Sequence, residues 1–330
     1  MGKPSVSGQR SINLRDLGVN RDSKLTPSDN YIRNTENLEQ KTYRLRTDDD
    51  GFIIGENNLK TEKGSVDILF FGGSTTECKY VEESKRFPYL VQESLSELLK
   101  KRITTLNGGV SGNNTIHSTL NLIAKGIHKK PKTIILMHNI NDLVGLKKTG
   151  SYYNQPYRRM PVQKTIVNTS LKGRIRDLKN ALIPNIYNAF DNMIFRPNVD
   201  EWNGFRNKDT IPFVKIKNEF EKSISSFISI AKSHNIDVIL MTQFNRINMS
   251  DEKIIANDME IDSSFVSMYH KLNEKIREIA SKEKVGLIDL AEDVPSNNMF
   301  IYDAVHLNTN GSEYVANIIT NYLYEKNYLN

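Results

Sequence analysis

Cysteine is nearly absent from this chain of 330 residues. The single cysteine, Cys78, excludes an internal disulfide and any cysteine-rich zinc site. Long apolar runs are absent too, because those at residues 133–137 and 238–241 are far too short to cross a bilayer. The first residues, MGKPSVSGQR, lack the apolar core of a signal peptide. These absences predict a cytoplasmic protein without a membrane span, or an extracytoplasmic one if an N-terminal anchor has been removed.

Motifs for nucleic-acid binding are also missing. The sequence has no zinc-finger spacing, no RNP-like strand and no basic helix followed by a zipper. The net charge of +6 permits attraction to acidic partners but does not by itself indicate nucleic acid. We therefore expect a small-molecule or glycan partner, and the oligomeric state cannot be read from the sequence.

The chain divides into an arm and a domain. Residues 1–45 are polar and have no apolar period, so we expect an arm that wraps the surface or stays disordered. Residues 46–330 alternate between apolar runs and helical spacing, as one compact α/β domain does. At 145–212 this alternation breaks, and several prolines and a basic, aromatic composition predict an insertion.

Five short apolar runs are typical of buried strands, and they lie at 66–71, 103–106, 133–138, 236–241 and 285–290. Between and after them, segments with helical spacing lie at 87–99, 116–127, 213–233, 265–282 and 312–324. Strands linked by helical crossovers form parallel sheets covered on both faces. The sequence therefore predicts a three-layer α/β/α sandwich with a mostly parallel five-stranded sheet.

Four short polar blocks follow these runs or lie in loops. They are Gly72-Gly73-Ser74-Thr75-Thr76, Gly109-Val110-Ser111-Gly112-Asn113, Asn139-Ile140-Asn141-Asp142 and Asp303-Ala304-Val305-His306. Ligands bind at the carboxyl ends of strands in open α/β sheets, which is where such blocks gather. Together they contain a hydroxyl nucleophile, a base, a carboxylate and oxyanion donors, the set that acyl transfer through a serine ester needs.

Ser74 is the candidate nucleophile because it lies where a buried strand gives way to a helix. Taken alone, the block also fits a Gly-Ser turn that caps a helix; a phosphate-binding loop would need a lysine that is missing. His306 is the candidate base, since it alone among six histidines has an acidic residue, Asp303, three positions before it near a helix start. Cys78 lies one helical turn beyond Ser74 and is expected to be a packed thiol.

The candidate oxyanion donors are the backbone N–H groups of Ser74 and Gly112 and the side-chain amide of Asn141. Gly112 follows the second predicted strand, where a glycine lets a backbone N–H face a substrate oxygen. Asn141 follows the third strand and offers a neutral amide. Asp142 is expected to bond loop backbone.

These blocks resemble the four motifs of the SGNH hydrolase superfamily, the GDSL-type esterases and lipases, from about residue 66 to residue 316. The resemblance implies a flavodoxin-like sandwich, no metal and no organic cofactor. It also implies that Ser74, Asp303 and His306 form a catalytic triad and that Gly112 and Asn141 are oxyanion donors. Two positions depart from the motifs. Gly73 replaces the usual aspartate, and Asn139 replaces a glycine, for which asparagine is suited because it tolerates positive φ.

The leading hypothesis is a serine esterase that forms an acyl-enzyme and removes a short acyl group. Acetate on a carbohydrate or glycan is the substrate that the resemblance mainly implies, and the absence of a long apolar stripe for a lipid chain agrees with it. An O-acyltransferase with the same triad is an alternative, as is a non-catalytic glycan- or partner-binding module on the same fold. The tyrosines and arginines of the 145–212 insertion are candidates for stacking on sugar rings or holding an acidic substrate; the alternative is that the insertion is a solvated cap with no ligand role.

Overall fold

A parallel sheet of five strands lies at the centre of the computed structural model, which describes residues 8–12, 14–56, 66–156, 159–166, 210–247 and 261–329. The strands are β4 (Ile68–Gly72), β5 (Thr105–Gly109), β6 (Thr133–Met137), β8 (Asp237–Met241) and β9 (Gly286–Ile288). Their order is β5-β4-β6-β8-β9, and every neighbouring pair is parallel. The chain thus adds β5 on one side of β4 and the later strands on the other, which places a topological switch point at β4.

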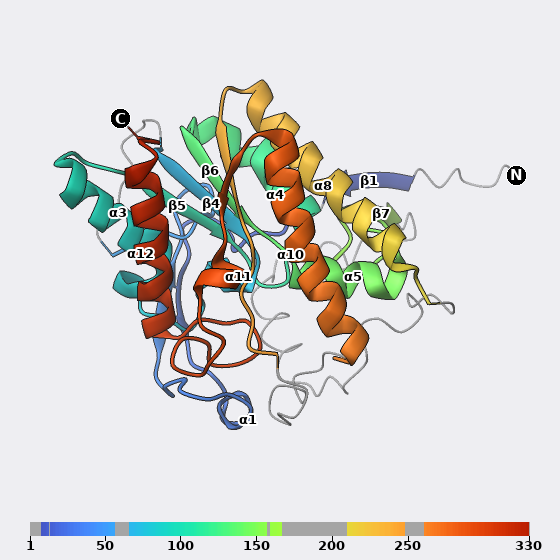
Figure 1. Cartoon of the computed structure of the whole chain (residues 1–330), viewed down its shortest axis with the longest axis horizontal. Helices are drawn as coiled ribbons and strands as arrows, with labels where there is room; N and C mark the ends of the chain where they lie inside the picture. The colour runs from blue at the N-terminus through green and yellow to red at the C-terminus, as the bar shows by residue number, and fades with distance from the viewer. Residues whose placement is uncertain are drawn as a thin grey trace, which may run out of the picture.

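Helices cover both faces of this sheet (Figure 1). One face packs on α3 (Phe87–Leu99) and α12 (Thr309–Glu325), and the other on α4 (Thr115–Asn121), α5 (Ile140–Thr149), α8 (Phe213–Ser233) and α10 (Ser263–Glu283). The short helices α2 (Ser74–Glu77) and α11 (Leu290–Asp293) begin close after strand ends. The three-layer α/β/α prediction is therefore confirmed. Among the described residues, no helix combines the length and apolarity that crossing a membrane requires.

The strands are largely buried, and most of their side chains are apolar. Ile68 and Phe70 pack with the α3 and α12 side, while Leu69 and Phe71 pack with the α8 side, as the two-residue period of a strand requires. The helix predicted at 116–127 divides into α4, a π-helical turn (Leu122–Gly126) and a 3-10 turn (Ile127–Lys129). Gly126 permits close packing there, because a Cβ on it would lie 3.1 Å from the Phe71 ring.

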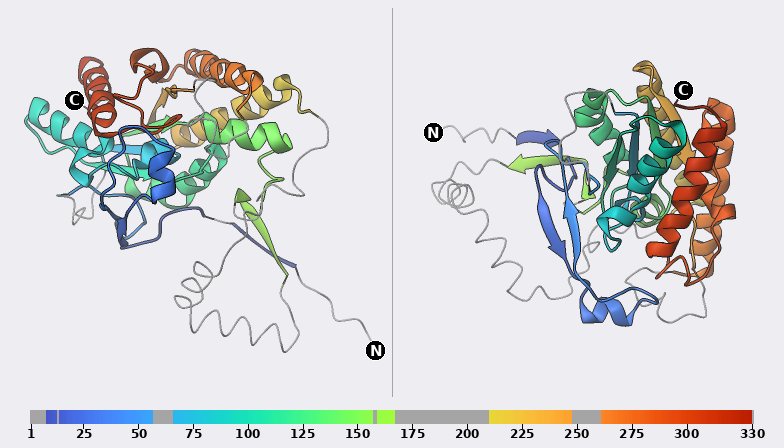
Figure 2. Two further views of the ribbon diagram at one scale, coloured as in Figure 1. Left: turned by 90° about the horizontal axis from the view of Figure 1, so that it is seen from below. Right: turned by 90° about the vertical axis from the view of Figure 1, so that its left-hand side faces the viewer.

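Residues 14–45 of the arm lie against the domain; Arg15, for example, donates to the backbone oxygens of Ser111 and Gly112. β2 (Asp22–Leu25) pairs antiparallel with β3 (Tyr43–Arg46), and α1 (Asp29–Arg33) lies between them in sequence (Figure 2). A second antiparallel pair joins β1 (Gly8–Ile12) to β7 (Val162–Ile166). Of the predicted insertion, residues 145–149 belong to α5, and 167–209 lie outside the described residues.

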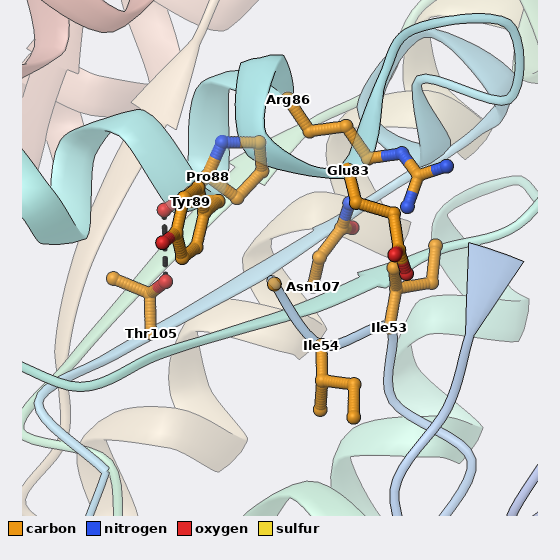
Figure 3. A pocket seen from close by; sticks show the side chains of 9 residues that line it. Ile53, Ile54, Glu83, Arg86, Pro88, Tyr89, Thr105 and Asn107 are labelled. Carbon is orange, nitrogen blue, oxygen red and sulfur yellow. Dashed lines mark hydrogen bonds between the residues drawn. The ribbon is translucent and has the colours of Figure 1, made fainter. Parts of the chain in front are cut away.

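A buried ion pair fixes β3 to the domain. Arg46 Nε donates to Glu83 Oε1 at 3.0 Å, with the two side chains 9% and 10% exposed. Glu83 opens the 3-10 turn η1 (Glu83–Lys85), and the Arg86 guanidinium that follows donates to the backbone oxygen of Arg44 at 2.6 Å. Figure 3 shows Glu83 and Arg86 beside a cavity of about 10 Å³, which has room for roughly one water molecule.

Removing one partner of this pair should destabilise the protein strongly. Glu83→Ala leaves the Arg46 charge buried without its counter-ion, which costs about 3–5 kcal/mol of unfolding free energy. The control is Glu82→Ala, which removes a half-exposed pair with Lys41 and should cost less than about 1 kcal/mol. Urea denaturation of both variants measures the difference. Equal losses of unfolding free energy would contradict a stabilising role for the buried Arg46–Glu83 pair.

Candidate active site

Ser74 begins α2 just after the carboxyl end of strand β4. Gly73 is the N-cap residue of this helix, and Ser74 is its first residue. The turn is crowded: a Cβ on Gly72 would lie 2.1 Å from Thr76 Oγ1, and one on Gly73 would lie 2.5 Å from Asn141 Nδ2. Both glycines are therefore required by close packing at the point where the strand becomes a helix.

His306 and Asp303 lie in the loop that leads into α12. His306 Nε2 is 2.7 Å from Ser74 Oγ, and His306 Nδ1 is 2.6 Å from Asp303 Oδ2. The other carboxylate oxygen, Oδ1, accepts the backbone N–H groups of Val305 and His306 at 3.0 and 2.8 Å. Residues separated by more than 230 positions thus form one hydrogen-bonded chain from hydroxyl to imidazole to carboxylate.

The charges of Asp303 and His306 stabilise each other. Burial opposes ionisation of Asp303, but the positive charge of His306 and the hydrogen bonds to the carboxylate outweigh it, so the pKa of Asp303 lies below its ordinary value. Burial likewise disfavours the charged imidazole, but the Asp303 charge prevails and raises the pKa of His306 above 6.5. Glu77 also raises this pKa, and Lys79 lowers it.

The two other candidate oxyanion donors approach the Ser74 turn from neighbouring strands. Asn141 lies in the first turn of α5, after β6, and its Nδ2 donates to the backbone oxygen of Asn113 at 2.8 Å. Gly112 precedes Asn113 in the loop after β5 and has a φ of +76°, a conformation that favours glycine. The Asn141 amide therefore bridges the Gly112 loop and the Ser74 turn, since it also lies against Gly73.

Asn139 does not need the positive φ that the sequence suggested. Its φ is −162°, extended backbone that any residue adopts. Its side chain has a different role. Asn139 Nδ2 donates to the backbone oxygen of Tyr269 at 3.0 Å and to Asn273 Oδ1 at 2.8 Å, and both residues are on α10. Asparagine at this position thus ties the start of α5 to a neighbouring helix.

Asp142 anchors loop backbone, as expected. The carboxylate is fully buried and accepts the Thr115 N–H at 3.1 Å and the Tyr152 hydroxyl at 2.6 Å. Because Thr115 begins α4, the contact holds the Gly112 loop beside the helix that carries Asn141. Burial raises the pKa of Asp142 to about 6.

Sequence reasoning missed Gln243, which lies just after β8. Gln243 Nε2 donates to Thr75 Oγ1 at 2.8 Å, and Gln243 Oε1 accepts the Ile140 N–H at 3.0 Å. Thr75 in turn donates to the backbone oxygen of Val305 at 3.2 Å, so the Gln243 amide links the Ser74 turn, α5 and the loop that carries His306. The sequence signal that could have identified Gln243 is its position just after a buried strand. Glu77 was missed too; it accepts both the N–H and the hydroxyl of Ser111.

The insertion residues separate into different roles. Tyr152 is in the core, and Lys147 pairs with Asp262 at 3.0 Å. Arg159 reaches the site: a Cβ on Gly112 would lie 3.6 Å from its Nη1 and 3.2 Å from Nη2 of Arg15. Four others, Tyr157, Lys172, Arg174 and Arg176, lie outside the described residues, as does Arg158.

Cys78 is a packed thiol rather than a second nucleophile. It is buried, its Sγ donates to the Thr75 oxygen at 3.3 Å, and burial raises the pKa of the thiol to about 12. In the described part of the chain, one group of carboxylates has the spacing for a metal, Asp48, Asp49 and Asp50. Lys129 forms an ion pair with each of them, and none belongs to the candidate site.

Comparison with known proteins agrees with this architecture. The model of the GDSL-like lipase/acylhydrolase family matches residues 70–314. The chain belongs to this family. It is accordingly a serine ester hydrolase, and the resemblance expected from the sequence is confirmed. No curated protein matches the chain.

Several solved structures resemble the fold at low identity. An acetyl xylan esterase is 18% identical over 77% of this chain and 98% of its own, with a TM-score of 0.45. The acetylxylan esterase Axe2 from Geobacillus stearothermophilus is 16% identical over 80% and 96%, with a TM-score of 0.46. A GDSL-like lipase from Bacteroides thetaiotaomicron is 14% identical over 79% and 88%, with a TM-score of 0.43. At this distance the likeness does not extend to substrate.

The His306 imidazole should titrate above pH 6.5 in the folded protein. In Asp303→Asn the attraction that raises the pKa is lost while burial remains, so the pKa should fall below 6.5. NMR titration of the histidine resonances, assigned with His306→Gln, measures both values. His117 and His138 serve as internal references, because burial lowers the pKa of each to about 3. An unchanged His306 pKa in Asp303→Asn would contradict this electrostatic account.

Proposed function

We propose that this protein hydrolyses short-chain acyl esters, acetyl esters of a carbohydrate foremost, with Ser74, His306 and Asp303 as its catalytic triad. The observation that supports this most directly is the contact chain of 2.7 Å from Ser74 Oγ to His306 and 2.6 Å from His306 to Asp303. A hydroxyl, an imidazole and a buried carboxylate within hydrogen-bond reach are the geometry of an activated serine nucleophile.

In the proposed reaction His306 Nε2 takes the proton of Ser74 as Oγ attacks the ester carbonyl carbon. The carbonyl oxygen becomes an oxyanion, stabilised by the N–H groups of Ser74 and Gly112 and by Asn141 Nδ2. Protonated His306 then gives its proton to the leaving alkoxide, and the C–O bond breaks to leave an acyl-enzyme. Water attacks this ester as His306 takes one of its protons. His306 returns that proton to Ser74 Oγ as the bond from Oγ to the acyl carbon breaks and the acid leaves. Asp303 stays ionised and stabilises the imidazolium throughout.

The surroundings of the site favour a polar alcohol portion. The Asn141 amide lies against Gly73, and the guanidinium groups of Arg15 and Arg159 lie beside Gly112, where Arg15 also donates to the backbone oxygens of Ser111 and Gly112. Amides and guanidinium groups donate hydrogen bonds to hydroxyl oxygens, as sugar recognition requires. This lining supports a carbohydrate ester with a small acyl group over a lipid ester.

Removing the nucleophile or the base should abolish most of the activity. Ser74→Ala and His306→Ala should each lower kcat by about 10³-fold or more, and the double variant should lose little further, because the two act as one unit. Hydrolysis of p-nitrophenyl acetate, butyrate and octanoate measures this, with acetate expected to be fastest. Independent, additive losses would overturn the triad, and product formed only when a glycan acceptor is present would assign an acyltransferase.

Gly73→Ala should act through Asn141. The added Cβ lies 2.5 Å from Asn141 Nδ2 and must displace the amide, so kcat should fall by roughly 10²–10³-fold, the loss expected for one oxyanion donor. In an Asn141→Ala background the same substitution should cost little, since the displaced group is gone. A Gly73→Ala loss as large in that background as in the wild type would exclude Asn141 as the group affected.

A further inference from the structure

The polar arm contacts the carboxylate of the proposed triad. The hydroxyl of Tyr31, on α1, donates to Asp303 Oδ2 at 3.2 Å. This oxygen is the one that also accepts His306 Nδ1. Tyr31 precedes the family match, which begins at residue 70, so the contact comes from a part of the chain that the match does not cover.

The Tyr31 hydroxyl completes the hydrogen bonding of a buried charge. An ionised carboxylate has about four acceptor positions. Three of those on Asp303 are taken by His306 Nδ1 and by the backbone N–H groups of Val305 and His306, and Tyr31 supplies the fourth. The Asp303 side chain is only 5% exposed, so little solvent is available to replace a missing donor.

The tyrosine is held in place and kept as a donor. Its ring packs on Tyr80 at 5.5 Å and on the edge of Tyr302 at 6.3 Å between centroids. Tyr302 in turn stacks on the His306 ring at 5.6 Å, with planes 17° apart. Burial and the nearby Asp303 charge raise the pKa of the Tyr31 hydroxyl well above its ordinary value, so it carries its proton at every working pH.

A second arm residue holds the loop itself. The backbone N–H of Glu36 donates to the backbone oxygen of Tyr302 at 2.7 Å, and the Glu36 carboxylate forms an ion pair with Arg246. The backbone N–H of Arg246 donates to the backbone oxygen of Ala304 at 2.8 Å, and its Nε donates to the backbone oxygen of Asp303 at 3.3 Å. Figure 1 shows α1 beside the loop that precedes α12, as these contacts require.

We propose that Tyr31 is a positioning residue of this enzyme, supplied by the arm, that orients Asp303 and moderates the charge that Asp303 presents to His306. The inference rests on the proposed function, in which Asp303 and His306 act on Ser74. A hydroxyl that donates to the carboxylate draws part of its negative charge away from the imidazole. Tyr31 therefore makes His306 less basic than Asp303 alone would make it, and it keeps the carboxylate aligned with Nδ1.

The test compares Tyr31→Phe with Tyr43→Phe. Both substitutions remove one hydroxyl from the same aromatic cluster, since the Tyr43 and Tyr80 ring centroids are 5.8 Å apart. The Tyr43 hydroxyl, however, donates to the backbone oxygen of Glu39 and not to Asp303. In Tyr31→Phe, kcat/KM for p-nitrophenyl acetate should fall about five- to tenfold, the loss expected for one typical hydrogen bond. The acidic limb of its pH profile should move up by a few tenths of a unit, because His306 becomes more basic.

Tyr43→Phe should leave both the rate and the acidic limb unchanged. Glu77 and Lys79, the other charges that act on the His306 pKa, are the same in both variants. An acidic limb unmoved in Tyr31→Phe, or moved equally in Tyr43→Phe, would overturn the inference and leave the proposed function intact. NMR titration of His306 in both variants gives the same comparison without substrate. If Ser74→Ala hydrolyses the ester at the wild-type rate, the proposed function is wrong. The NMR titration of His306 then still decides whether Tyr31 acts on the Asp303–His306 pair.

Discussion

Asp303 carries a negative charge in a place where burial alone would favour the neutral acid. Hydrogen bonds to both of its oxygens and the adjacent imidazole reverse that preference. The candidate site depends on this balance, because an ionised carboxylate is what raises the pKa of His306 and directs its Nε2 to Ser74. The turn from Asp303 to His306 builds part of the arrangement locally, since the carboxylate accepts the N–H groups of the residues two and three positions later.

The parallel sheet supplies the other half of the geometry. β4, β5 and β6 end at one edge in register, with Gly72 opposite both Gly109 and Met137. The segments that follow these strands carry Ser74, Gly112 and Asn141, and contacts among Asn113, Asn141 and Gly73 hold these segments together. Gln243, from the loop after β8, extends the same network to Thr75 and Ile140. A rigid sheet edge thus keeps groups from distant parts of the chain within hydrogen-bond reach.

The arm lies outside the family match, which covers residues 70–314. Although the arm is polar overall, three of its apolar side chains are buried, Leu38, Tyr43 and Leu45, and Arg46, directly after it in the chain, forms a buried pair with Glu83. Anchored in this way, the arm places Tyr31 and Glu36 against the loop that carries Asp303. The part of the chain outside the family match is therefore built into the surroundings of the candidate triad.

The sequence by itself determined the layered fold, the five strands and the four polar blocks, because apolar periodicity and strand-end loops are local properties. It also identified Ser74, Gly112, Asn141, Asp303 and His306 as candidates. Only the tertiary structure decided which groups surround them. The extended backbone of Asn139, the bridge made by Gln243 and the contact of Tyr31 with Asp303 all depend on residues distant in sequence. The reason is physical: a hydrogen bond across 272 positions leaves no periodic trace in the residues that form it.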